Sequence, residues 1–236
     1  MKYIQKNVKE PKTLSDYRLT TPYANYKGGN FDAEQLKISL LEEQGHICAY
    51  CMGKISLELN DMHKPKVEVE HLKPREKYPH LSLDYTNMLA VCNGLSELYP
   101  DKIHIQHCDK TKGVAGKMNG QVELQKLNPL NKSNSEDLLI YDLNGKIKSK
   151  TNNEVVENDL NMVLNLNNDV LIKHRRVILD KVTSDLIQEK PMQQWTQSLF
   201  DKHLSLWQNK IKGKYRQYCM VAIWFLNDLK TKPRYQ

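Results

Sequence analysis

Four cysteines in the first half of the chain constrain its fold more than any other feature. Cys48 and Cys51 are two residues apart, Cys92 and Cys108 follow at longer distances, and a fifth, Cys219, stands alone in an apolar stretch. The opening sequence MKYIQKNVKEPK has no apolar signal-peptide region, and no apolar run reaches the length of about 18 residues typical of a membrane span. We therefore expect a cytoplasmic protein without a membrane segment. Thiols stay reduced there, which argues against a disulfide framework.

The spacing of these cysteines predicts a metal site. Two thiolates separated by two residues bind one ion from a tight turn, and a second pair from further along completes a closed tetrahedral zinc site. His104 and His107 are alternatives to Cys108 as the fourth ligand, because imidazole also binds zinc. Ordinary buried thiols are the competing interpretation, and a redox pair is disfavoured because no βαβ pattern surrounds it. The predicted ligands of a structural Zn²⁺ are Cys48, Cys51, Cys92 and Cys108.

The chain divides into three regions by composition. Residues 1–31 are polar and interrupted by Pro11 and Pro22, so we expect an irregular or partly extended arm. Residues 32–120, dense in Cys, His, Asp, Asn and Lys, are expected to form a zinc-stabilised module. Residues 121–236 are expected to be mostly helical, which makes the whole a mainly helical α+β protein.

Local signals predict several elements. Asp32 as a cap, a leucine stripe and Gly45 as a stop indicate a helix over about 33–44. The run VEVEH at 67–71 is typical of a strand, and a short helix is expected near YTNMLAV at 85–91. The Asn-Gly pair within 141–149 indicates a two-residue hairpin turn.

Three helical patterns occupy the C-terminal region. The first covers about 169–187, the second extends from Trp195 to Ile211, and the third extends from Tyr215 to Leu229. The third is so apolar that it must be buried on all sides or dock a partner.

Glu70 and His71 form a pair that suits phosphodiester hydrolysis. A carboxylate can hold a divalent metal while a neutral imidazole takes a proton from water. On its own such a pair on a strand is usually incidental. Two further residues sit around the cysteines: Asn87, placed to hold a loop by hydrogen bonds to the backbone, and Asp109, directly after the fourth cysteine. Asp109 is alternatively a helix cap.

The order Cys-x-x-Cys, Glu-His, Asn, Cys and Cys-Asp over about residues 40–117 resembles the HNH nuclease family. The resemblance implies a ββα-metal fold, with a hairpin carrying His71 as general base and a helix carrying the last metal ligand. It implies that Glu70 and Asp109 hold a catalytic ion and that Asn87 is the central asparagine. Most family members have His or Asn where this chain has Asp109. Two carboxylates suit Mg²⁺ or Mn²⁺ and make a catalytic zinc less fitting.

The segments EQGHICAYC, VEHLKPR and QHCDKTKG are similar to the HNH subunit of Septu-type anti-phage systems, including those that accompany retrons (PtuB-like). This resemblance implies a partner, an ATPase subunit of the ABC or SMC-like type, for which the C-terminal helices offer a docking surface.

A net charge of +7 permits binding to nucleic acid without proving it. We expect DNA as the substrate, with RNA such as tRNA as the alternative. The candidate contacts to backbone phosphates are Lys73, Arg75, Lys110 and Lys112. For the lysines at 110 and 112 a solvated face is the competing interpretation.

A non-catalytic zinc-stabilised nucleic-acid-binding or adaptor module is the rival function. A zinc deaminase is excluded because its His-x-Glu and Pro-Cys-x-x-Cys strings do not occur.

Overall fold

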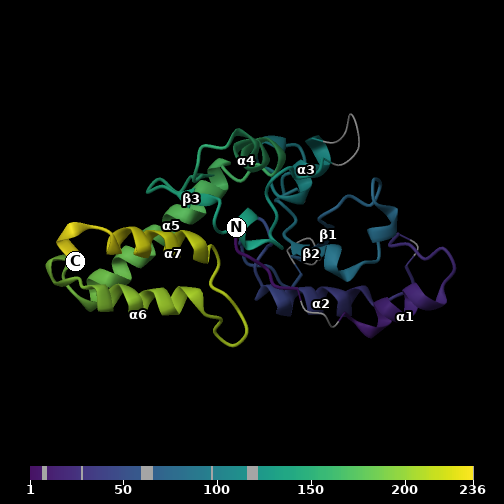
Figure 1. Cartoon of the computed structure of the whole chain (residues 1–236), viewed down its shortest axis with the longest axis horizontal. Helices are drawn as coiled ribbons and strands as arrows, with labels where there is room; N and C mark the ends of the chain where they lie inside the picture. Colours follow the sequence, from purple (N-terminus) through teal and green to yellow (C-terminus); the bar gives the residue numbers. More distant parts are fainter. Residues whose placement is uncertain (7–9, 28, 60–65, 97, 116–121, 236) are drawn as a thin grey trace.

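The computed structural model describes residues 1–6, 10–27, 29–59, 66–96, 98–115 and 122–235. Two short antiparallel sheets lie among helices, which confirms the expected mainly helical α+β class. Figure 1 shows the C-terminal helices at one end of an elongated molecule and the N-terminal helices at the other, with the strands between them. The module boundary expected at residue 120 lies outside the described residues.

The expected irregular arm contains a helix, α1 (Lys12–Thr20). Pro11 precedes it and its carbonyl accepts hydrogen bonds from Leu14 and Ser15. A proline lacks an N–H, but the first turn of a helix does not use that donor, so Pro11 begins the helix instead of interrupting the chain. Leu14 and Tyr17 lie one turn apart and are both buried, which fixes α1 against the rest of the protein.

Helix α2 (Ala33–Gln44) has the predicted bounds and caps. The Asp32 side chain accepts a hydrogen bond from the Gln35 N–H at 2.8 Å, and Gly45 ends the helix at φ 64°, a conformation that glycine adopts without steric cost. The last residue, Gln44, donates to the Ala90 carbonyl and accepts from the Ala90 N–H, both at 2.8 Å. Its side-chain amide therefore acts like one more strand residue and joins α2 to the first sheet.

Strands β1 (Glu68–His71) and β2 (Met88–Val91) form that sheet, with Glu70 opposite Leu89 and His71 opposite Met88. The short helix expected near 85–91 is confirmed only at its start, because a 3₁₀ helix at Tyr85–Asn87 leads directly into β2. All residues of β2 are buried. A short, fully apolar run does not distinguish a buried strand from a helix, so the surrounding fold decided it.

The second sheet pairs β3 (Leu139–Tyr141) with β4 (Ile147–Ser149) around the predicted Asn-Gly turn. The loop is longer than two residues, because the Asp142 N–H bonds to the Lys146 carbonyl and the Gly145 N–H returns to Asp142. Gly145 takes φ 84°, as in hairpin loops of three residues that end in a left-handed position. The hairpin is held from below by the buried Arg175, whose Nε donates to the Gly145 carbonyl at 2.5 Å.

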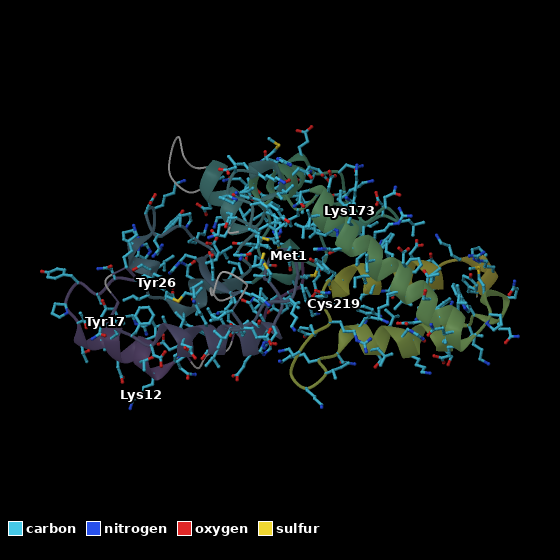
Figure 2. All side chains as sticks on the ribbon, turned by 180° about the vertical axis from the view of Figure 1, so that it is seen from behind. Met1, Lys12, Tyr17, Tyr26, Lys173 and Cys219 are labelled. Carbon is cyan, nitrogen blue, oxygen red and sulfur yellow. The ribbon has the colours of Figure 1, made fainter. Side chains whose placement is uncertain are left out.

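Helices α5 (Asp169–Glu189), α6 (Gln197–Gln208) and α7 (Cys219–Lys230) confirm the three C-terminal patterns. The predicted end of the second helix and the predicted start of the third lie in the loop over 209–218. Ile211 pairs there with Lys214 around a turn at Gly213. Helix α7 packs against α5, α6 and β3, so its apolar character is explained by burial. Met1 lies near Cys219 in the middle of the molecule (Figure 2), and its amino group donates to the Tyr141 hydroxyl at 3.1 Å.

The remaining elements are short. Helix α3 (Asp109–Ala115) follows the fourth cysteine, and α4 (Glu154–Asn158) continues into a π-helical turn at Asp159–Val163. The other 3₁₀ turns cover Pro79–Leu81, Ile103–Ile105, Lys132–Asn134, Met192–Gln194 and Pro233–Tyr235. Among the residues described, none of the helices combines the length and apolar character needed to cross a membrane.

Candidate metal centre and active site

The four predicted zinc ligands come from three parts of the chain. Cys48 and Cys51 lie in the tight turn after α2, where the Cys48 N–H bonds to the Gly53 carbonyl and the Met52 N–H bonds to the Cys48 carbonyl. Cys92 follows β2 directly, and Cys108 precedes α3. The Cys108 N–H donates to the Leu164 carbonyl at 2.9 Å, so the C-terminal region also holds the fourth cysteine in place.

The sulfur atoms have the geometry of a tetrahedral zinc site. All four lie within 4.8 Å of one another, and the Cys48–Cys108 and Cys51–Cys92 Sγ pairs are each 3.8 Å apart. Zn–S bonds of about 2.3 Å in a regular tetrahedron require sulfur separations of about 3.8 Å. The cluster could therefore hold a metal ion such as zinc.

The histidine alternatives to Cys108 are not needed to complete this set. His104 is exposed. His107 is buried beside the cluster, with its Nδ1 3.2 Å from the Cys108 sulfur. Since the four sulfurs already fit one ion, His107 is a neighbour of the centre, and burial lowers its pKa to about 4.

Two carboxylates lie close together beside the cysteine cluster. Glu70, on β1, is 3% exposed and accepts a hydrogen bond from the Tyr50 hydroxyl at 3.0 Å. Asp109, at the start of α3, has a buried Oδ1 that no described group contacts by a hydrogen bond. Burial and then the negative charge of Glu70 raise the pKa of Asp109 to about 8. The two carboxylates are therefore not fully neutralised by nearby positive charges, and a bound cation would be favoured between them.

Lys112 supplies part of that charge from inside the protein. Its side chain is 0% exposed, and its ammonium group donates to Glu70 Oε1 at 2.5 Å. It also donates to the His71 and Leu72 carbonyls at 3.2 and 3.3 Å. The sequence led us to expect Lys112 as a surface contact to phosphate, or as part of a solvated face, but the structure places it in the interior as the partner of Glu70.

Replacing Lys112 by methionine is expected to lower the free energy of unfolding by about 3–5 kcal/mol, because it leaves the buried Glu70 without its counter-charge. The control is Lys110→Met. Lys110 pairs with Glu68 at 2.5 Å with both side chains 28% exposed, and such surface pairs contribute about 0–1 kcal/mol. Urea unfolding of the zinc-loaded protein without Mg²⁺ or Mn²⁺ makes the comparison. Equal losses in the two variants would contradict a structural role for the buried pair.

His71, the second residue of the predicted pair, is 3% exposed at the end of β1. Its Nε2 lies 2.9 Å from the Ser82 carbonyl oxygen, and because that oxygen only accepts, Nε2 carries the ring proton. Nδ1 is then the basic nitrogen. Burial, with a smaller contribution from the Arg75 charge, lowers the pKa of His71 to about 4 in spite of the Ser82 hydrogen bond. The imidazole is neutral at physiological pH.

Asn87 holds the loop between β1 and β2 beside His71. Its Oδ1 accepts from the Lys73 N–H at 2.8 Å, and its Nδ2 donates to the Lys73 and Leu81 carbonyls at 3.1 and 3.3 Å. The Lys73 side chain pairs with Glu123. The Arg75 guanidinium lies over the Tyr26 ring, 4.8 Å from its centroid.

Sequence reasoning missed two aromatic residues of this site. Tyr50 lies between the paired cysteines, so the zinc turn itself brings its hydroxyl to Glu70; burial raises the pKa of Tyr50 well above its ordinary value and keeps it a hydrogen-bond donor. Tyr26 packs edge-on against His71 with ring centroids 4.8 Å apart. The first has a signal in the Cys-x-x-Cys spacing, and the second has none.

Comparison with known proteins supports one of the expected resemblances. No family model matches the chain. It aligns with the Septu protein PtuB of Bacillus thuringiensis over 200 residues at 28% identity, covering 76% of this chain and 72% of that protein. The chain is similar to PtuB. The PtuB-like character expected from the three quoted segments is thereby confirmed, whereas the wider HNH assignment stays a prediction.

Proposed function

We propose that this chain is the nuclease subunit of a Septu-type anti-phage system and that it cuts nucleic acid by HNH chemistry. The observation that carries the proposal is that three side chains suited to phosphodiester hydrolysis lie close together on β1 and at the start of α3. A neutral histidine with a basic Nδ1 ends β1, a buried glutamate precedes it, and an aspartate without a partner on Oδ1 begins α3. The likeness to PtuB supports the Septu assignment.

Glu70 and Asp109 would hold the catalytic Mg²⁺ or Mn²⁺. Oxygen ligands suit these hard cations. Burial and then the charge of Glu70 raise the pKa of Asp109 to about 8, and a divalent cation would offset both effects. Such an ion, when bound, stabilises negative charge on the reacting phosphate. Tyr50 and Lys112 hydrogen-bond to Glu70 and would hold this ligand in place inside the buried site.

His71 would act as the general base. Its Nδ1 takes a proton from a water molecule aimed in line at phosphorus, while the Ser82 carbonyl keeps Nε2 protonated and the ring oriented. With a pKa of about 4, set mainly by burial, the His71 imidazole is unprotonated and able to accept that proton. The products would carry a 5′-phosphate and a 3′-hydroxyl.

Lys73, Arg75 and Lys110 would contact the phosphate backbone, a contact that carries no sequence preference. Arg75 is the best placed of the three, because Tyr26, the ring beneath it, also touches His71. An ATPase subunit of the ABC or SMC-like type would be the partner, docking on the C-terminal helices.

The test is cleavage of plasmid DNA and of tRNA by the zinc-loaded chain, with and without the ATPase encoded beside it. Cleavage is expected with added Mg²⁺ or Mn²⁺ and not in a buffer that contains neither ion. A metal-free buffer is used instead of a chelator, because a chelator would also remove the structural zinc. The two substrates distinguish a DNase from an RNase. Binding of either nucleic acid without cleavage under all these conditions would instead support the non-catalytic adaptor.

A further inference from the structure

A cavity of about 460 Å³ opens beside His71, and the proposed chemistry does not fill it. This volume falls within the range of about 300–1,000 Å³ that is typical of small-molecule sites. Its walls come from the loop after α1 and from the loop after β1. The lining residues with aromatic, charged or hydrogen-bonding groups include Tyr23, Tyr26, Lys27, Arg75, Glu76 and Ser82.

The cavity presents flat apolar surfaces. The Tyr23 side chain is 99% exposed and has no ring partner among the described residues, so both faces of its ring are open to a ligand. Tyr26 forms a second aromatic wall, and the planar guanidinium of Arg75 lies over it. Tyr26 appears on the same side of the molecule as α1 and its Tyr17 (Figure 2). Aromatic rings and guanidinium planes are the surfaces on which nucleobases stack.

The cavity is connected directly to the candidate general base. One of its walls, Tyr26, packs edge-on against the His71 ring at 4.8 Å. Another lining residue, Ser82, gives its carbonyl to His71 Nε2 at 2.9 Å. A group in the cavity is therefore separated from the His71 ring by Tyr26 and Ser82.

The charged residues around the cavity suit a base inside it with phosphates at its edge. Lys27 and Arg75 are positive, but Glu76 also lines the cavity and would repel a phosphate placed there. A carboxylate can accept hydrogen bonds from the exocyclic amines of a base, while the two cations hold the phosphates on either side.

We propose that this cavity binds an unstacked nucleobase next to the scissile phosphate. The proposal rests on the nuclease function and deepens it, because a base can enter the cavity only from single-stranded or locally opened nucleic acid. DNA and RNA share the chemistry that the cavity recognises. Tyr23 and the Arg75 guanidinium, which lies over the Tyr26 ring, stack the base, and Tyr26 connects this stack to His71.

The experiment measures equilibrium binding rather than cleavage, so the result does not depend on nuclease activity. The zinc-loaded His71→Ala chain is titrated with a fluorescent dT oligomer and with an abasic oligomer that carries the same number of phosphates. A uridine oligomer and a blunt duplex complete the set. The variants are Tyr23→Ala, Tyr23→Phe, which keeps the ring, and Tyr99→Ala as a control at an exposed tyrosine that does not line the cavity.

The dT oligomer is expected to bind more tightly than the abasic oligomer by between about fivefold and about 150-fold, the contribution of one stacked base. Tyr23→Ala should reduce that difference, while Tyr23→Phe and Tyr99→Ala should preserve it, and the duplex should bind like the abasic oligomer. The uridine arm shows whether RNA is held equally well. Equal affinity for dT and abasic oligomers, or a base effect untouched by Tyr23→Ala, overturns the proposal. Base-dependent binding in a protein that never cleaves would instead refute only the nuclease function.

Discussion

His71→Ala is expected to lower phosphodiester cleavage by about 10²–10⁴-fold, the contribution of a positioned general base. The loss should appear in kcat at saturating Mg²⁺ or Mn²⁺, because His71 acts on the attacking water and the proposed metal ligands are Glu70 and Asp109. Zinc content should stay unchanged, since the four sulfurs form their own cluster. Single-turnover cleavage of labelled DNA or RNA, with zinc measured in the same samples, makes the test.

Two variants keep this result interpretable. His71 is buried and bonds to the Ser82 carbonyl, so alanine also removes a structural hydrogen bond. His71→Gln retains an amide N–H that can donate to Ser82 but offers no base of comparable strength, and it should be as inactive as alanine. His80 is exposed in the turn at Pro79–Leu81, and His80→Ala should cleave normally. Full activity in His71→Gln would refute the assignment of the base.

Cys51→Ser is expected to abolish stoichiometric zinc binding and to unfold the zinc-stabilised module expected over residues 32–120. Apparent binding free energies of structural zinc are about 10–16 kcal/mol, as large as the whole stability of a typical domain. The cluster joins the turn after α2, the end of β2 and the start of α3, so losing the ion would free the sulfur contacts of all three segments at once. Zinc analysis after gel filtration and thermal melting by circular dichroism measure the two effects.

The matched control is Cys219→Ala, which removes the fifth thiol. Cys219 is buried but does not belong to the four-sulfur cluster, and burial raises the pKa of its thiol to about 11. The substitution should retain full zinc and cost little stability beyond a small cavity. A Cys51→Ser protein that holds one zinc per chain and melts like the wild type would show that the cluster is no structural metal site.

Elements that rest on local signals were predictable. The caps and leucine stripe of α2 act within one or two turns of chain, so the helix appears with the expected bounds. Helix α5 follows for the same reason, with Asn168 accepting from the Val170 and Leu171 N–H groups at its start. The PtuB likeness was also predicted from three short segments, and the alignment extends over 200 residues.

The departures share one physical cause, which is a dependence on partners far along the chain. Residues 88–91 form a strand because β1 pairs with them, and nothing in four apolar residues states that. Pro11 begins a helix because Leu14 and Tyr17 find a core to bury in. Tyr26 reaches His71 across 45 positions, and a tyrosine in a polar segment carries no sign of it.

The cysteine spacing by itself predicted a metal site, since two thiolates in one tight turn need only two more ligands to close a tetrahedron. It left Cys108, His104 and His107 as alternatives for the fourth ligand, and the folded chain brings the sulfur of Cys108 to the other three. What surrounds that cluster was decided by the tertiary structure. From the sequence alone, Lys112 would be expected at the surface. In the folded protein it lies in the interior, because it neutralises the buried Glu70, which is 42 positions earlier in the chain. The choice between surface and interior follows from the field of neighbouring charges, which exists only once the chain has folded.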